Sequence, residues 1–163
     1  MFREMRRSRQ ALSPEECEQV LKRATSGVLA VHGDGGYPYA VPLSYVYADS
    51  RLYFHCAASG HKLDAIASDD RVSFCVIDQD EIHPEKYTTF FRSVILFGRA
   101  RILEDPQEKR AALELLAARY SPDYEEGRKK EIDQLFRQVR MVEVIPEHIT
   151  GKEAIELVRM RQD

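Results

Sequence analysis

A run in which every second residue is large and apolar constrains the fold of this chain more than any other feature. In the segment 37–47 these residues are Tyr39, Val41, Leu43, Tyr45 and Tyr47. A period of two is typical of a strand that turns one face to a core. A second apolar run, Val28 to His32, precedes it, and the turn residues Gly33-Asp34-Gly35-Gly36 join the two. We therefore expect two antiparallel strands here, the second spanning 37–47.

Four further segments have the composition of strands, namely 52–55, 72–76, 90–103 and 141–145. Gly98 interrupts the third of them and predicts a bend or bulge. Strands that follow one another at this spacing indicate an antiparallel barrel rather than a doubly wound sheet.

Helices are expected between and after these strands. Ser13-Pro14-Glu15-Glu16 has the residues of a capping box, with proline in the first turn. A short helix is expected at 61–68 and a longer one from Asp105-Pro106, whose inward positions are Ala111, Leu113, Leu115, Leu116 and Ala118. A polar segment, 121–130, precedes a helix at 131–139, and Thr150-Gly151-Lys152-Glu153 begins a terminal helix. The predicted fold class is α+β, a barrel with flanking helices.

Composition limits the kind of protein. The 163 residues suit a single domain, 1–163, in which 1–11 form a flexible N-terminal arm. A net charge of −3 favours neither nucleic acid nor an acidic lipid surface, so we expect no nucleic-acid partner. No apolar run is long enough to span a bilayer, so we expect no membrane partner. Three cysteines without a CxxC pair indicate a reducing cytoplasm.

The segment Ser59-Gly60-His61-Lys62 is the strongest candidate for a binding site. It lies between a strand and a helix, where unpaired N–H groups and the positive end of the helix dipole suit a phosphate. Gly60 lets the backbone approach an anion, and Ser59 can cap the helix. The alternative is ordinary capping beside a solvated lysine.

Other candidates are weaker. The spacing of His55 and His61 matches no zinc site, so no metal site is predicted. His61 is suited to contact an anion. His55 is either a donor to a heteroatom of a ligand ring or a half-buried strand histidine. Arg92 and Ser93 lie among apolar residues, where the arginine needs a partner: a carboxylate of this chain or a ligand phosphate. Lys152 belongs to the second expected helix start. Since the sequence contains no nucleophile elbow, Walker loop or GxGxxG, a cofactor is expected to carry any chemistry.

Three stretches together resemble the pyridoxamine-phosphate-oxidase-like flavin proteins, and within them the nitroimidazole-resistance group. They are Gly35-Gly36-Tyr37-Pro38-Tyr39-Ala40-Val41-Pro42-Leu43-Ser44-Tyr45-Val46-Tyr47, then Leu52-Tyr53-Phe54-His55-Cys56-Ala57, then Gly60-His61-Lys62-Leu63-Asp64. Arg92-Ser93-Val94-Ile95-Leu96-Phe97-Gly98-Arg99-Ala100 and Thr150-Gly151-Lys152 are also similar. The likeness extends from Leu12 to about Glu153.

The resemblance implies an antiparallel split β-barrel that forms a homodimer with FMN at the subunit interface. The phosphate would be held by Ser59, His61 and Lys62, with His61 as the candidate catalytic residue. The flavin ring would lie along Val41, Pro42, Leu43 and Ser44, beside His55, Cys56 and Ala57, and Arg92, Ser93 and Lys152 would complete the site. Cys56 stands where related sequences often carry serine. The substrate-phosphate arginines of the oxidases are missing, which disfavours pyridoxamine phosphate oxidation.

Three functions remain open at this stage. The first is an FMN-dependent oxidoreductase that reduces small electrophilic molecules such as nitroaromatics. The second is a barrel that binds haem or another cofactor without turnover, with His61 or His55 as an axial ligand. The third is a structural or regulatory dimer whose anion site is empty. FMN and a deazaflavin are not distinguished by these residues.

Overall fold

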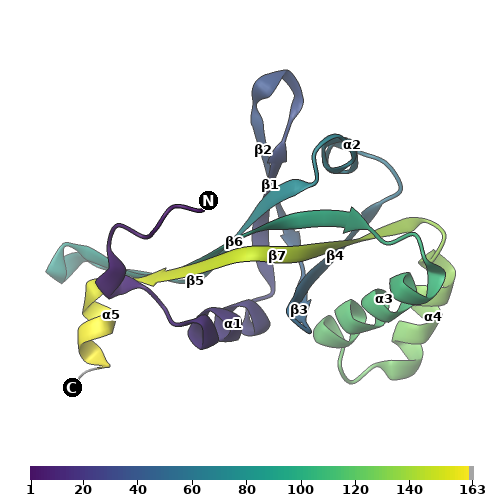
Figure 1. The fold of residues 1–163 in the computed structure, drawn as a ribbon. Coiled ribbons are helices and arrows are strands. Elements are labelled where there is room, and N and C mark those ends of the chain that lie inside the picture. Colours follow the sequence, from purple (N-terminus) through teal and green to yellow (C-terminus); the bar gives the residue numbers. More distant parts are fainter. Residues whose placement is uncertain (162–163) are drawn as a thin grey trace.

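The computed structural model describes residues 1–161 and contains one curled antiparallel sheet that does not close (Figure 1). Its strands are β1 (Ser26–His32), β2 (Pro38–Ser44), β3 (Val46–Ala48), β4 (Arg51–Ala57), β5 (Arg71–His83), β6 (Thr88–Ile102) and β7 (Val139–Glu153). They follow the order β2-β1-β5-β6-β7-β4-β3. The predicted split barrel with flanking helices is confirmed.

Residues 1–161 also form five α-helices and three short 3-10 helices. They are α1 (Pro14–Arg23), α2 (His61–Ser68), α3 (Pro106–Tyr120), α4 (Glu125–Leu135) and α5 (Ile155–Met160), with η1 (Ser8–Gln10), η2 (Asp34–Gly36) and η3 (Pro84–Lys86). None of the helices within residues 1–161 is long and apolar enough to cross a bilayer. The capping box is confirmed: the Glu16 N–H donates to Ser13 Oγ (3.2 Å), and the Ser13 N–H donates to the Glu16 carboxylate (2.7 Å).

The barrel encloses the main core, and the alternation in 37–47 points to it as expected. Tyr39, Val41 and Leu43 pack against this core, while Tyr45 and Tyr47 are buried in it. The prediction of a single strand over 37–47 is wrong, because β2 stops pairing with β1 at Ser44 and the chain turns away at Tyr45. The Tyr45 N–H donates to the Thr25 carbonyl, and its hydroxyl donates to the Leu21 carbonyl (2.7 Å). The chain then starts β3 at the opposite edge of the sheet.

A second core lies between the sheet and the helix pair α3–α4. Ala112, Leu113 and Leu116 pack there around the fully buried Met141. The expectation that Ala111, Leu115 and Ala118 face inward is wrong. These three form a separate stripe of α3 and are exposed beside α4, because the sheet covers only the neighbouring face of the helix. The helix expected at 131–139 in fact begins at Glu125 and ends at Leu135, so the polar segment is largely helical.

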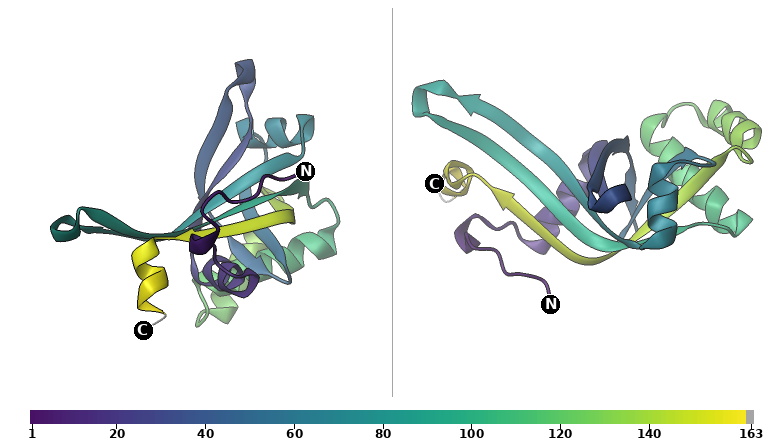
Figure 2. Two further views of the ribbon diagram at one scale, coloured as in Figure 1. Left: turned by 60° about the vertical axis from the view of Figure 1, so that its left-hand side comes forward. Right: turned by 90° about the horizontal axis from the view of Figure 1, so that it is seen from above.

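Strands β5 and β6 continue beyond the barrel as a long hairpin (Figure 2). Since each strand finds its partner in the other, β5 extends to His83 rather than ending at 76. The bulge predicted at Gly98 is confirmed by a register shift between Phe97 and Gly98 opposite β7.

The C-terminal part of β7 corrects another expectation. Residues 150–153 do not begin a helix: they pair with Arg92–Ile95 of β6, and α5 starts only at Ile155. The N-terminal segment runs beside this strand. Ala11 forms a bridge with Lys152, and the buried Gln10 side chain donates to the Glu153 carbonyl (2.9 Å).

Candidate functional site

The start of α2 has the backbone geometry of an anion site. Gly60 is the N-cap, with φ +145°, a conformation that residues with a side chain rarely adopt. The expectation that Ser59 caps this helix is wrong, since the cap position belongs to Gly60 and no side chain accepts there. Helical hydrogen bonding begins with the N–H groups of Leu63 and Asp64, which both donate to the Gly60 carbonyl. Within the described chain the N–H groups of His61 and Lys62 have no acceptor.

The His61 ring is held against the β1–β2 hairpin. It stacks on Tyr39 with ring centroids 4.1 Å apart, and its Nε2 lies 3.4 Å from the Asp34 N–H and 3.7 Å from the Asp34 carboxylate. These contacts fix the imidazole at the edge of the α2 start. As general chemistry, an imidazole so placed can donate to an anion or transfer a proton.

Two cations lie near the end of β4 without a carboxylate. Among residues 1–161, neither Lys62 nor Arg140 forms an ion pair; Arg140 donates only to the carbonyls of Arg137 and Val139, at 3.4 and 3.3 Å. Arg140 is the cross-strand partner of Cys56. Burial raises the pKa of the Cys56 thiol, and the charges of Lys62 and Arg140 oppose that shift. Sequence reasoning missed Arg140, because only the β4–β7 register brings it to this end of the sheet.

The strands next to α2 present alternate residues to solvent. On β2, Pro42 and Ser44 are exposed, whereas Val41 and Leu43 pack against the core. On β4, His55 and Ala57 are exposed and flank a buried residue, Cys56. The thiol therefore points into the core, and any contact of Cys56 with a ligand would come from its backbone. His55 differs from His61 in that its ring has no hydrogen-bond partner in the described structure.

Arg92 lies in a different environment, among carboxylates of this chain. Its Nε and Nη2 donate to Glu153 Oε2 at 3.1 and 3.0 Å, and its Nη1 donates to Asp78 (3.3 Å). Glu153 is fully buried, so this pairing satisfies a charge that would otherwise be costly. Of the two partners that the sequence left open, the folded chain supplies the carboxylate. Ser93 and Lys152 are cross-strand neighbours here, and the ammonium of Lys152 lies 5.2 Å from the centre of the Phe91 ring.

The predicted site residues thus form two groups that a single chain keeps apart. The first group lies around β2, the end of β4 and the start of α2. The second group, Arg92, Ser93 and Lys152, lies where β6 meets the far end of β7. Val139 of β7 pairs with Ala57, and Glu153 pairs with Arg92. The 14 steps between Val139 and Glu153, at roughly 3.3 Å each, span about 46 Å along the strand.

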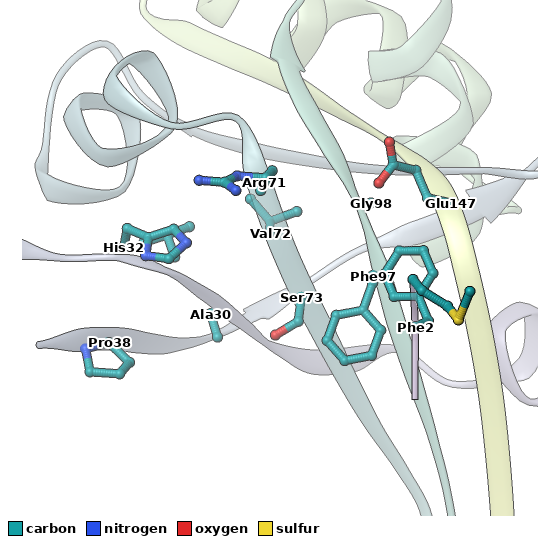
Figure 3. Close-up of a pocket in the computed structure, with 12 residues that line it drawn as sticks. Phe2, Ala30, His32, Pro38, Arg71, Val72, Ser73, Phe97, Gly98 and Glu147 are labelled. Carbon is teal, nitrogen blue, oxygen red and sulfur yellow. The ribbon is translucent and has the colours of Figure 1, made fainter. Parts of the chain in front are cut away.

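A cavity of about 540 Å³ opens on the outer face of the sheet (Figure 3). Its floor comes from β1, β5 and β6, with Ala30, Ser73 and Phe97 among the lining residues, and Phe2 of the N-terminal segment borders it. Arg71 and His32 lie at its rim, where Arg71 forms a bidentate ion pair with Asp69. Nothing in the sequence indicates this cavity, since its lining comes from distant segments.

Comparison with known proteins places this geometry in a family. The model of the pyridoxamine 5'-phosphate oxidase family matches residues 13–153. A search of curated proteins finds no match.

Solved structures share the fold. A candidate 5-nitroimidazole antibiotic resistance protein from Bacteroides thetaiotaomicron is 23% identical, with a TM-score of 0.74 over 88% of this chain and 86% of that one. An FAD-binding protein from Mesorhizobium loti is 27% identical, with a TM-score of 0.67 over 89% and 97%. An FAD and haem binding protein from Mycobacterium smegmatis is 21% identical, with a TM-score of 0.73 over 90% and 73%. The family model covers nearly the whole length of the chain, and the chain therefore belongs to the pyridoxamine 5'-phosphate oxidase family.

Proposed function

We propose that this protein binds FMN and uses it to reduce small electrophilic molecules such as nitroaromatics. The observation that carries the proposal is the start of α2, which has two unpaired N–H groups and, near it at the end of β4, two cations without carboxylates, Lys62 and Arg140. A phosphate monoester fits such a position in charge and hydrogen bonding. The family match and the FAD-binding relative support a flavin as the molecule that carries this phosphate.

The chain itself contributes binding, orientation and proton handling. With a reduced nicotinamide as the electron donor, bound FMN would supply the hydride and electron chemistry that these side chains lack. The phosphate would be held by the N–H groups of His61 and Lys62 and by the Lys62 ammonium. The exposed residues Pro42 and Ser44 would border the ring, and His55, whose imidazole is exposed, would be available to hold a proton near it. His61 would orient the phosphate from its position against Asp34 and Tyr39.

A homodimer would unite the two groups of predicted residues. A two-fold axis across the middle of the long strands would bring the α2 end of one chain beside the Arg92 end of the second, and it would do so twice. The outer sheet face suits this contact because it exposes apolar side chains: Ile77 is 66% exposed, Ile82 75% and Ile95 41%. Ser93 and Lys152 would then contact the cofactor bound mainly by the other chain.

Removal of the Lys62 charge tests the phosphate position. Loss of a charge-assisted hydrogen bond of about 1.5–3 kcal/mol should weaken FMN binding by roughly 10- to 150-fold in Lys62→Ala. The measurement is fluorescence titration of the flavin-free protein with FMN, and Lys130→Ala, on the exposed side of α4, is the matched control. Equal FMN affinity in Lys62→Ala and the control would contradict the proposal.

Haem is the second cofactor to test, because the exposed His55 imidazole could act as an axial ligand and a relative of similar fold binds both FAD and haem. A Soret band after haem addition that is lost in His55→Ala, without any FMN-dependent rise in melting temperature, would favour haem over the flavin.

A further inference from the structure

The N-terminal segment concentrates positive charge in a chain that is otherwise acidic. Four arginines and one glutamate give residues 1–9 a formal charge of +3, so that residues 10–163 carry −6 within the total of −3. Three of these arginines, Arg6, Arg7 and Arg9, lie within four positions of one another. A local concentration of one charge favours a ligand of the opposite charge.

The three guanidinium groups have no partner in the part of the chain that the structure describes. None of them forms an ion pair or donates a hydrogen bond, not even with Glu4, the one carboxylate of the segment. Arginines elsewhere in the molecule, such as Arg71, Arg99 and Arg101, are paired with carboxylates. The donors of the three N-terminal arginines are therefore available to a ligand.

The backbone that carries these arginines is fixed to the sheet. The Gln10 N–H donates to the Arg7 carbonyl at 3.0 Å and closes the turn η1. The Gln10 side chain is buried against the end of β7, and Ala11, the next residue, forms a bridge with Lys152. The arginines thus extend from a turn that is held in place, which lowers the entropy cost of ordering them around a ligand.

A cavity of about 310 Å³ lies between this turn and α5 (Figure 1). The three arginines and Ser8 line it on the side of the turn, and Ile155 gives it an apolar wall on the side of α5. Glu156, the carboxylate next to that wall, accepts from the Thr88 hydroxyl at 3.3 Å. The volume is enough for a phosphate group with the sugar that carries it.

The cavity lies at an edge of the sheet. At residues 150–153, β7 pairs with β6 on one side, and the N-terminal segment lies against its other side. The lining residues include none of the outer-face isoleucines that we assign to the subunit contact. Because Ala11 bridges Lys152, a ligand in the cavity would lie close to the residue that reaches the cofactor of the other chain in the proposed dimer.

We propose that this cavity binds the 2'-phosphate of a nicotinamide dinucleotide, the group that distinguishes NADPH from NADH. A phosphate monoester carries about −1.5 to −2 charge at pH 7 and three acceptor oxygens. The planar guanidinium group of arginine matches these oxygens with paired N–H donors, and arginine accommodates the same 2'-phosphate in other dinucleotide sites. Recognition of a phosphate monoester rests on the arginines and the cavity. The choice of a nicotinamide dinucleotide rests on the proposed function.

Titration of the full chain with NADP⁺ and NAD⁺ tests the inference, because the two probes differ only in this phosphate. Isothermal titration in a phosphate-free buffer, with and without FMN, gives both affinities for wild type and for the double variant Arg7→Gln, Arg9→Gln. We expect wild type to bind NADP⁺ at least about 10-fold more tightly than NAD⁺, and the double variant to lose most of this difference. Arg3→Gln is the matched control, since it removes a charge of the same segment outside the cavity.

Three results would overturn the proposal. Equal affinity of wild type for NADP⁺ and NAD⁺ would show that the phosphate is not recognised. An equal loss in Arg3→Gln would show non-specific attraction to a basic segment. Inorganic phosphate that binds as tightly as NADP⁺ would assign the arginines to a free anion.

The same titrations separate this inference from the proposed function. The double variant should bind FMN as wild type does, because the phosphate position at the start of α2 is unchanged. Since NADP⁺ is also titrated without FMN, a failure of flavin binding would contradict the proposed function and leave the preference for NADP⁺ readable. Melting temperatures of all variants verify that each is folded.

Discussion

Asp78 shows at the residue scale how a charge network should make stability depend on pH. Its carboxylate accepts from Arg23 at 2.7 Å and from Arg92 at 3.3 Å, and its side chain is only 10% exposed. The hydrogen bonds from Arg23 are the largest cause of a pKa below the ordinary value of 3.8, and Arg92 adds to them. The folded state therefore holds this proton less tightly than the unfolded chain does. The stabilisation is complete above the ordinary pKa and is lost as the pH falls through the folded value.

We therefore expect Asp78→Asn to lower the free energy of unfolding at pH 7 by about 1.5–3 kcal/mol. The difference from wild type should shrink when urea unfolding is repeated near pH 3, where protonation begins to remove the wild-type advantage. Asp80→Asn, at an exposed position of the same strand, should change stability by less than about 0.5 kcal/mol. A difference for Asp78→Asn that stays constant with pH would show that its charge is not involved.

Arg92 and Arg140 show how far the sequence alone predicts the surroundings of a single residue. The need of Arg92 for a partner follows from its apolar neighbours, but the identity of that partner does not. Glu153 and Asp78 reach Arg92 only through the β6–β7 and β5–β6 pairings. Arg140 has no unusual neighbours in the sequence, and its position near Lys62 depends on strand register alone. The neighbours of a residue in the sequence thus show that it needs a charged partner, but only the strand pairing shows which residue that partner is.

At the scale of elements, Gly98 should be indispensable to β6. A Cβ added there would lie 2.4 Å from the Ile145 carbonyl oxygen and 3.1 Å from a Val144 methyl group, and both neighbours are held in β7. We expect Gly98→Ala to destabilise the protein by about 2 kcal/mol or more, because the two strands must separate. Gly127→Ala is the matched control: on α4 the nearest atom would be 3.9 Å away, and alanine favours the helix. Equal urea midpoints for the two variants would contradict the role of the bulge.

Elements that depend on local signals could be predicted, and elements that depend on distant partners could not. The helix at 61–68 has the predicted bounds, and α1 begins with the predicted capping box. Residues 150–153 have the composition of a helix start, yet they extend β7, because Arg92–Ile95 offers them a complete ladder of strand hydrogen bonds. On α3 the apolar residues form two stripes, and the sequence does not say which of them the sheet covers.

At the scale of the whole molecule, the important fact is the separation of the two groups of predicted site residues. The antiparallel barrel follows from the pattern of the sequence and from the resemblance. The distance of about 46 Å along β7 does not, since it needs the register of β4, β6 and β7 together. A chain that keeps Lys62 and Lys152 so far apart can use both for one ligand only if a second copy supplies one of them. This requirement turns the proposed dimer into a quantitative prediction.

Mixed dimers of two defective variants should regain flavin binding. If each site takes Lys62 from one chain and Lys152 from the other, Lys62→Ala and Lys152→Ala alone leave both sites of their own dimers impaired. A mixed dimer instead has one site with both substitutions and one site with neither. When equal amounts are unfolded and refolded together, half of the dimers are mixed, so about a quarter of all sites should bind FMN with wild-type affinity. Fluorescence titration measures that fraction, and refolding each variant alone is the control. If Lys152 instead served the site of its own chain, or if the protein were a monomer, the mixture would contain no intact site and would bind no better than its two components.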